Sequence, residues 1–564
     1  MLTCVKSVLH FSNRQIHLNV IVAQRLNDRK LGLRTVSTSQ SQRSAQSPAE
    51  GSQPRFRRDD ETADKSTRRV SGGIPTTGSS IGDAVITTLV GLGAVFFGGI
   101  AYVAWYKKNV LDKMELAFAR GYDPALELAS AAKRRNASHQ SDASPSEPVW
   151  PEHVRRREQD LIDRVIRGAE AGQYYMLLGP KGTGKGTMIL DAMQAVQAEG
   201  VAMCDAHPDL EVFRLRLGKA LNYEYNEDTQ TGLFQRRDPR EAGPSLDIER
   251  ALNKLEKVAL RHTQRTGRPL ILVINNVHYF KNDDDGKNML LQLQYRAETW
   301  AAGGIMTLVF STDDFWPYLL MKKVATRLQV VAVGDLSLKD AARATSLMRL
   351  NMRRALPDAV SIQEAVSVVG GRLSYLSKIA RAQDVQDAAN NILAVETAWL
   401  QSQIGLIPDC DDDVMDEQKW SSCSWLLLRE FVQQRREDER ERRKAVKSGK
   451  LSPDDLDELP LPKIPYYKCR QIMTRPDFLE GLDRANIIAI DVNHNVTPDS
   501  LLILRAAQEV VETSGFNKLL DDVRNRVDEI ESLHRTRELT FKDVNAGDRI
   551  RVSVDKGNAL LIEF

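Results

Sequence analysis

The sequence has little of what a disulfide framework, a metal centre or a strong overall charge would require. Only five of its 564 residues are cysteines, and none stands in a CxxC or His-paired spacing, so we interpret them as ordinary thiols. The 78 basic and 76 acidic residues nearly cancel, so net charge does not argue for nucleic acid as an obligatory partner. No HExxH motif is present, which excludes the usual zinc-protease site.

The first fifty residues contain seven Lys or Arg against only Asp28 and Glu50. Scattered apolar residues between these basic ones are typical of a transit peptide, and we predict one over residues 1–40 with a mitochondrial destination. A disordered basic tail would have the same composition. Residues 41–80 are rich in Ser, Gln, Arg and Gly and are expected to form a disordered arm.

A stretch without charged residues, Ala84 to Tyr106, is long enough to cross a hydrocarbon layer of about 30 Å. Aromatic residues and two lysines stand at its C-terminal end, as is common at a membrane interface. These features predict a single transmembrane helix over residues 81–106; a buried helix of a soluble protein is the alternative. Ala94 and Gly98 would allow two such helices to approach closely.

Over residues 107–149 we predict a short helix from about Asp112 to Arg134 and then a Ser- and Pro-rich linker from Asn136 to Pro148, and the linker is expected to contribute no core. Beyond Trp150, apolar strand-like runs alternate with helical stretches, which predicts an α/β fold with a parallel sheet covered by helices. The predicted units are an ATPase core at 150–335, a helical lid at 336–408 and a C-terminal α+β domain at 409–564. In the last unit, the charged tract Arg435 to Lys444 is expected to be a solvated helix extension or a linker. Two helices followed by a possible strand pair, Ile487 to Asp491 and the apolar run Leu501 to Leu504, suggest a winged helix.

The strand YYMLL is followed by GPKGTGKGT and then by a helical pattern, the order that a P-loop requires. In such a loop, backbone N–H groups and the helix N-terminus hold phosphates, and Lys185 reaches the terminal ones. An ordinary glycine turn is the alternative. The residues predicted to bind ATP or ADP are Gly179, Pro180, Lys181, Gly182, Thr183, Gly184, Lys185, Gly186 and Thr187.

Two positions depart from a working ATPase pattern. Gly186 stands where Ser or Thr usually holds Mg²⁺, so a role for Mg²⁺ with this loop is left open. The apolar strand LILVI ends in Asn275 and Asn276 rather than in an acid, and an amide can bind water but cannot act as a general base near neutral pH. We therefore predict slow hydrolysis, with Asn275 at the water-orienting position; no metal ligands are assigned.

From Trp150 to about Ala382 the chain resembles P-loop ATPases of the AAA+ and STAND type, particularly the archaeal-ATPase and origin-recognition branches, in a fungal-type form anchored in a mitochondrial membrane. The resemblance implies that Arg327 approaches a terminal phosphate in an assembled or clamped state. It also implies a polar sensor and a lid arginine that is displaced by one residue. The matching positions outside the loop are Arg157, Glu158, Ser311, Thr312, Arg327 and Arg372.

Three functions remain open at this point. The first is a nucleotide-dependent switch or remodelling ATPase in the mitochondrial inner membrane, meeting a protein partner through its C-terminal domain. The second is a nucleotide-binding scaffold without catalysis. The third is a DNA anchor, supported by a basic cluster in the C-terminal domain but disfavoured by that domain's near-balanced charge. Homo-oligomerisation and the side of the membrane that the ATPase faces are not decided by the sequence.

Overall fold

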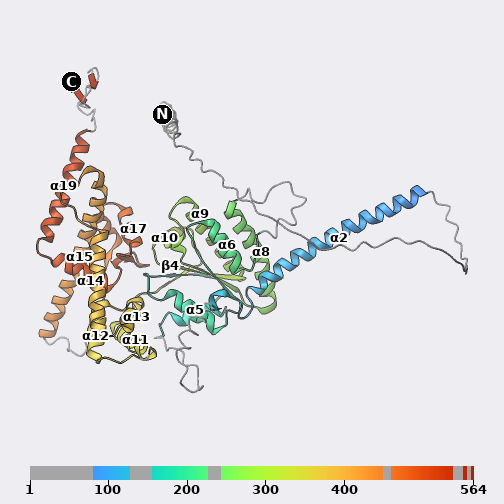
Figure 1. Ribbon diagram of the computed structural model, residues 1–564, viewed down its shortest axis with the longest axis horizontal. Coiled ribbons are helices and arrows are strands. Elements are labelled where there is room, and N and C mark those ends of the chain that lie inside the picture. The colour runs from blue at the N-terminus through green and yellow to red at the C-terminus, as the bar shows by residue number, and fades with distance from the viewer. Residues whose placement is uncertain are drawn as a thin grey trace, which may run out of the picture. The chain divides into compact units, whose positions relative to one another are not determined.

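The computed structural model describes residues 80–127, 155–225, 243–352, 354–448, 459–537, 551–554 and 560–563. The predicted transit peptide, nearly all of the predicted arm and the Ser- and Pro-rich linker lie outside these residues. Figure 1 shows the described helices and strands in colour. The described residues from Ala84 onward form one compact unit.

A five-stranded parallel sheet in the order β2-β3-β4-β1-β5 forms the centre of the ATPase core. Successive side chains of each strand point to opposite faces. Both sets are buried in β1, β3 and β4, which explains the almost uninterrupted apolar sequences of these strands. One face packs against α6, α8, α9 and α10, and the other packs against α4 and α5. The strands are β1 (Tyr174–Leu178), β2 (Val201–Asp205), β3 (Leu270–Asn275), β4 (Met306–Thr312) and β5 (Leu328–Ala332). The helices are α4 (Gln159–Ile166), α5 (Lys185–Ala195), α6 (Leu210–Ala220), α8 (Gly243–Thr266), α9 (Asp284–Gly303) and α10 (Trp316–Lys322).

Helix α2 (Ser80–Leu116) contains the predicted membrane span and continues beyond it without a break. It is the one helix among the described residues that is long and apolar enough to cross a membrane, and its apolar window is unburied. The last turns of α2 are different, because Val110 and Met114 are buried in the ATPase core. Ion pairs from Asp112 to Arg261 and from Glu115 to Arg265 join this end of α2 to α8.

The segment after α2 covers the edge strand β2. Phe118 is buried in the core, and its carbonyl accepts the N–H of Gly200 just before β2. The buried carboxylate of Asp123 accepts the N–H of Met203 within β2 at 3.0 Å, a group that an open sheet edge would leave unpaired. The segment at 110–126, which overlaps the helix predicted from about Asp112 to Arg134, therefore contributes to the core, and the linker expected to contribute none lies outside the described residues. The apolar residues of the segment at 110–126 are too sparse to be recognised as core without the sheet beside them.

The predicted helical lid is confirmed as four helices: α11 (Leu338–Asn351), α12 (Ala359–Val369), α13 (Leu373–Arg381) and α14 (Val385–Gln403). They enclose a small core of their own, which also takes in Leu502 from the C-terminal domain. Lid and C-terminal domain are therefore packed together rather than joined only by a loop.

The C-terminal domain has the predicted winged-helix content. Its first helix runs unbroken through the charged tract, as expected for a solvated helix extension. One detail differs, because the apolar run at Leu501 begins a helix and the second strand of the wing is β8. The elements are η4 (Asp412–Val414), α15 (Met415–Lys447), β6 (Ile464–Pro465), α16 (Tyr466–Met473), α17 (Pro476–Arg484), β7 (Ile488–Ile490), β8 (Asn495–Pro498), α18 (Leu501–Glu512) and α19 (Phe516–Arg537), with a separate antiparallel pair of β9 (Arg551–Val554) and β10 (Leu560–Glu563).

Candidate functional site

The loop between β1 and α5 is closely confined, and its glycines are needed there. A Cβ on Gly179 would lie 2.0 Å from the carbonyl oxygen of Val333. Gly182 and Gly184 have φ of +82° and +98°, values that side chains of L-residues rarely adopt. Gly184 is also the N-cap of α5 and offers no side chain to cap it, so an anion is the natural partner for the first-turn N–H groups. The loop therefore fits the phosphates of a nucleotide.

Lys185 is buried and turned back onto its own loop. Its Nζ donates to the carbonyl oxygens of Gly179 at 2.5 Å and Pro180 at 2.9 Å, and it forms an ion pair with Asp313 Oδ1 at 2.7 Å. Burial lowers the pKa of Lys185, an effect that the neighbouring Asp313 opposes. The lysine thus has an internal carboxylate as its counterion in this conformation, and a bound phosphate would compete for the same amine.

The parallel register explains why Asp313 reaches the loop. Leu178 and Thr312 are partners at the ends of β1 and β4, so the residues that follow them, Gly179 and Asp313, leave the sheet side by side. The backbone N–H of Asp313 donates to Nδ1 of His278 at 3.1 Å, while His278 Nε2 lies 3.7 Å from Asp313 Oδ2. Burial lowers the pKa of His278, which favours the neutral ring that the Nδ1 acceptor role requires.

The carboxyl end of β3 supplies no carboxylate. Asn275 is nearly buried, and its Nδ2 donates to Asp205 Oδ1 at 2.8 Å across the paired ends of β2 and β3. Asn276 has a left-handed φ of 56° and leads into η3 (Val277–Tyr279), the short turn that carries His278. Asn275 is therefore at the expected place in the sheet, but its amide is already engaged.

Arg372 at the start of α13 joins the lid, the loop and the C-terminal domain. It is 2% exposed and donates to the carbonyl oxygen of Lys181 at 2.9 Å and to Asp335 Oδ1 at 2.6 Å. Its Nη1 also donates to Asp499 Oδ2 at 2.7 Å, just before α18. Ser374, two residues further on, donates its N–H to the carbonyl of Gly182. The lid arginine predicted from the sequence is thus at the loop, although its contacts are to protein groups.

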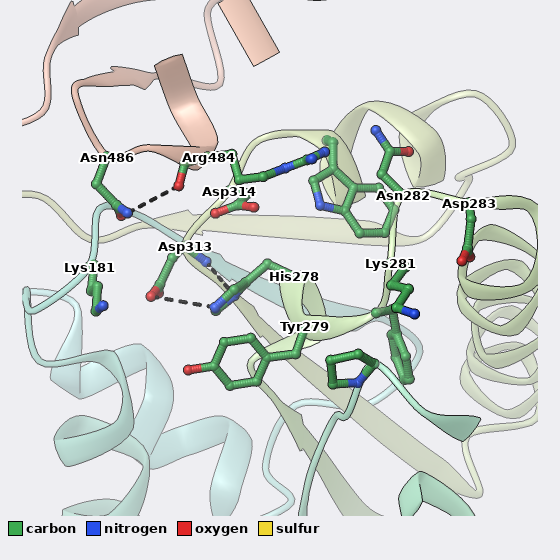
Figure 2. A pocket seen from close by; sticks show the side chains of 13 residues that line it. Lys181, His278, Tyr279, Lys281, Asn282, Asp283, Asp313, Asp314, Arg484 and Asn486 are labelled. Carbon is green, nitrogen blue, oxygen red and sulfur yellow. Dashed lines mark hydrogen bonds and ion pairs between the residues drawn. The ribbon is translucent and has the colours of Figure 1, made fainter. Parts of the chain in front are cut away.

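A cavity of about 610 Å³ opens beside Asp313, between the ATPase core and the C-terminal domain. Figure 2 shows Asp313 and His278 pointing toward one another there, with Lys181 on one side and Arg484 and Asn486 reaching in from α17 and the turn after it. The cavity therefore adjoins the loop at Lys181. Its walls are the Lys181 and Pro208 loops, His278 to Asp283, the Asp313 to Trp316 segment, Arg484 and Asn486.

Helix α17 is held against this part of the ATPase core. Asp483 Oδ2 accepts the N–H of Phe315 at 2.8 Å, and Glu480 accepts from Asn282 at 3.2 Å. Burial raises the pKa of Asp483 well above its usual value. In many winged helix domains the helix at this position reads DNA. Here one face of α17 is covered by the ATPase core.

Comparison with protein families matches two separate parts of the chain. Residues 153–305 match the AAA ATPase domain model, and residues 401–531 match the model for the C-terminal winged helix domain of fungal AAA proteins. The chain carries an AAA ATPase domain followed by a fungal-type AAA winged helix domain. The predicted fold class and the resemblance to AAA-type ATPases are thereby confirmed, and an AAA ATPase domain implies nucleotide binding, usually with Mg²⁺.

Two solved structures illustrate the similarity to known proteins. A Walker-type ATPase of Pyrococcus abyssi aligns with 65% of this chain and 99% of its own, at 14% identity and a TM-score of 0.39. Cdc6p from Pyrobaculum aerophilum aligns with 68% of this chain and 97% of its own, at 14% identity and a TM-score of 0.27. At these values neither likeness bears on function. No curated protein matches the chain at a significant level.

Arg327 does not enter the site of its own chain. It lies exposed before β5, where its carbonyl accepts the N–H of Tyr174 at the start of β1. The loop follows the other end of β1, about 17 Å away at the usual rise per residue. Arg327 can reach a terminal phosphate only in another subunit, and that role stays a prediction. Glu298, an acid that could have replaced the missing one on β3, lies at this same end of the sheet, away from the loop. Its carboxylate accepts hydrogen bonds from Tyr174 and Thr326.

Several site residues carried no sequence signal of their own. Asp205 is the last residue of β2 and Asp499 follows β8, and neither belongs to a recognisable nucleotide-binding motif. His278 is one turn beyond the expected catalytic strand, and its proximity to that strand was the only sequence feature that suggested a role in the site.

Two predicted loop residues with hydroxyl groups have different surroundings. Thr187 is exposed on α5, and the hydroxyl of Thr183 donates to the carbonyl of Pro180. Among the described residues no group of three or more His, Cys, Asp or Glu is placed to hold a metal ion.

Proposed function

We propose that the protein is an ATP-binding switch in which nucleotide state controls how the winged helix domain is held against the ATPase domain. It is anchored by α2 in the mitochondrial inner membrane and hydrolyses ATP slowly. The loop glycines, Lys185 and the uncapped start of α5 would hold the phosphates. Slow turnover follows from Gly186 and Asn275, which remove the usual Mg²⁺ ligand and water-orienting acid.

One short path carries this proposal. Lys185 pairs with Asp313, and two residues later the N–H of Phe315 is bonded to Asp483 of α17. A phosphate that attracts Lys185 removes the counterion of Asp313, and the same rigid segment must then readjust under α17. A second contact, from Lys181 through Arg372 to Asp499, links the loop to the winged helix domain from the lid side. A switch requires that these two contacts interact differently with the nucleotide states, and the experiment below measures that difference.

Hydrogen exchange on the full chain in lipid nanodiscs tests the switch. ATP and ADP should change protection in Pro476 to Arg484 and in Leu373 to Arg381 by different amounts. Lys185→Ala should abolish the nucleotide effect, whereas Lys219→Ala, at an exposed position of α6, should leave it intact. Identical exchange in the free, ATP-bound and ADP-bound protein would contradict the switch. Nucleotide binding without any such change would instead support a nucleotide-stabilised scaffold.

The membrane and organelle assignments are tested separately. The apolar window of α2 is unburied and ends in an aromatic and lysine belt, which supports a membrane span. The basic, acid-poor N-terminus supports a mitochondrial address. Carbonate extraction should leave the protein in the pellet, and release into the supernatant would remove the membrane assignment. Protease protection in mitoplasts would determine which side the ATPase domain faces.

A protein partner is favoured over DNA for the winged helix domain. One face of α17 is packed on the ATPase core, and Arg475, from the basic cluster, pairs with Asp477 and Asp416. Tight duplex binding with a steep salt dependence would reverse this preference. Self-association, through α2 or by Arg327 in trans, belongs to the same proposal and would be seen as a larger mass in detergent.

A further inference from the structure

The ATPase domain lacks an acid at the end of β3 but has one at the end of β4. Asp205 is the carboxylate nearest to Asn275, yet β2 is separated from β1 by two intervening strands, a lateral distance of about 14 Å at the usual strand spacing. Asp313 leaves the strand directly beside β1 and already touches Lys185 at 2.7 Å. Of the two carboxylates, only Asp313 is within reach of a group bound by the loop lysine.

Asp313 also has the surroundings of a water-activating group. Oδ1 is held by Lys185 and Oδ2 faces His278 Nε2 at 3.7 Å. The carboxylate borders the cavity of about 610 Å³, which also reaches Lys181 of the loop and is large enough to contain water. Because His278 Nδ1 accepts the N–H of Asp313, the ring of a neutral His278 carries its proton on Nε2, toward the carboxylate.

We propose that Asp313 is the catalytic acid–base group of this ATPase domain, in place of the missing β3 acid, and that His278 is its positioning residue. This inference rests on the proposed function. When phosphate takes over Lys185, Asp313 is left facing the cavity. A water oxygen there attacks the terminal phosphorus of ATP, the bond from that phosphorus to the bridging oxygen of ADP breaks, and Asp313 accepts the water proton. ADP and inorganic phosphate leave, and the proton passes to solvent.

The same arrangement explains why turnover is slow. Asp313 must first be separated from Lys185, so the buried ion pair opposes the active arrangement. His278 then keeps the backbone at Asp313 fixed by accepting its N–H, while its ring Nε2 faces the carboxylate at 3.7 Å. Asp313 therefore has two effects of opposite sign, because it weakens ATP binding and accelerates the chemical step.

These opposite effects give the test. Full-chain protein in nanodiscs is examined for ATP affinity by calorimetry and for the hydrolysis rate in a single turnover. Asp313→Asn should bind ATP more tightly, on the order of tenfold, because no carboxylate competes for Lys185. It should also hydrolyse on the order of 100-fold more slowly, as expected for a lost general base. Asp284→Asn, an exposed position in the first turn of α9, is the matched control and should change neither quantity.

The test of His278 must distinguish positioning of Asp313 from a purely structural role. His278→Ala should lower the maximal rate with little change in ATP affinity, and His278→Asn should restore part of the rate because its amide oxygen can accept the Asp313 N–H. An unchanged or faster rate in Asp313→Asn overturns the proposal, as does loss of hydrolysis in Asp205→Asn alone. Undetectable hydrolysis by the natural sequence also overturns it but leaves the switch standing. Absence of nucleotide binding would instead remove the proposed function.

Discussion

Arg372 and Asp499 form an ion pair, with Nη1 and Oδ2 2.7 Å apart, that fastens the lid to the winged helix domain beside the phosphate loop. Asp335 accepts from the same guanidinium, so one arginine serves two carboxylates that are otherwise poorly solvated. Burial raises the pKa of Asp499 to about 6, although Arg372 opposes this shift. The negative charge of buried Asp499 is therefore stabilised only while Arg372 is present.

Replacing Arg372 should therefore be strongly destabilising. Arg372→Ala leaves Asp499 buried without its partner, which commonly costs about 3–5 kcal/mol, and the thermal midpoint should fall by several degrees. Arg372→Lys should recover only part of the loss, because an ammonium cannot reproduce the fork of hydrogen bonds. Arg381→Ala, exposed at the end of the same helix, is the control. Equal midpoints for the Arg372 and Arg381 variants would contradict this account.

Lys185→Ala should lower ATP and ADP affinity on the order of tenfold or more, because it removes the charge that faces the phosphates. The fold should survive, since the loop is held by its own glycines and by Ser374. Calorimetry provides the affinity and circular dichroism checks the fold. If affinity is unchanged while Lys219→Ala is equally silent, the loop is not the nucleotide site.

A pH dependence follows from Asp314, whose pKa is raised to about 6 by burial and by the neighbouring Asp313, against the lowering effects of Arg484 and Lys185. A raised carboxyl pKa in the folded state means that stability from this group is greatest when it is protonated. It is lost as pH rises from about 4 to about 6. Asp314→Asn should gain about 1–3 kcal/mol at pH 7 and nothing at pH 4. Thermal midpoints across this range measure the effect, and a variant that parallels the natural protein at every pH would refute it.

The end of α2 gives a prediction about chain boundaries. A chain starting at Trp150 should be poorly folded, because it lacks Met114 and Phe118 from the core and leaves β2 uncovered. A chain starting at Lys107 should remain soluble and bind nucleotide. In the full chain, Met114→Ala should cost about 2–5 kcal/mol, whereas Leu116→Ala, exposed on the same turn, should be nearly silent. Equal solubility of the two shortened chains would show that the segment is dispensable.

Local sequence patterns predicted the elements that depend on local chemistry. The loop at Gly179 to Thr187, the four strands read as apolar runs and the unbroken charged helix all follow from periodicity or from glycine placement. The predictions failed where distant chain segments meet. Val110 and Met114 look like ordinary interfacial residues until α8 lies beside them, and Leu501 can begin a strand or a helix with equal propensity.

The candidate site shows the same limit. Asn275 indicated correctly that β3 lacks its acid, but the partner of its amide, Asp205, depends on the register of β2 and β3. Asp313 directly follows the predicted sensor residues Ser311 and Thr312, and its position beside Lys185 depends on the pairing of Leu178 with Thr312. Asp499 and Asp483 belong to a separate domain, so no spacing rule relates them to the loop.

The last prediction concerns restoring faster hydrolysis, and the structure changes how it should be attempted. Gly186 has open space where a side chain would project, with nothing within 4 Å of an added Cβ, so Gly186→Ser should be accommodated and supply a hydroxyl for Mg²⁺. Asn275→Asp alone would place a second carboxylate against Asp205, which now accepts from the amide at 2.8 Å, and the pKa of the pair would rise. Adding Asp205→Asn reverses that hydrogen bond and keeps one charge.

The triple variant, Gly186→Ser with Asn275→Asp and Asp205→Asn, should therefore exceed the natural hydrolysis rate by on the order of tenfold or more without a large change in ADP affinity. The double variant with Asp205 intact should gain less. A triple variant no faster than the natural protein, in a fold shown intact by its ADP affinity, would mean that the β3 position is not what limits hydrolysis.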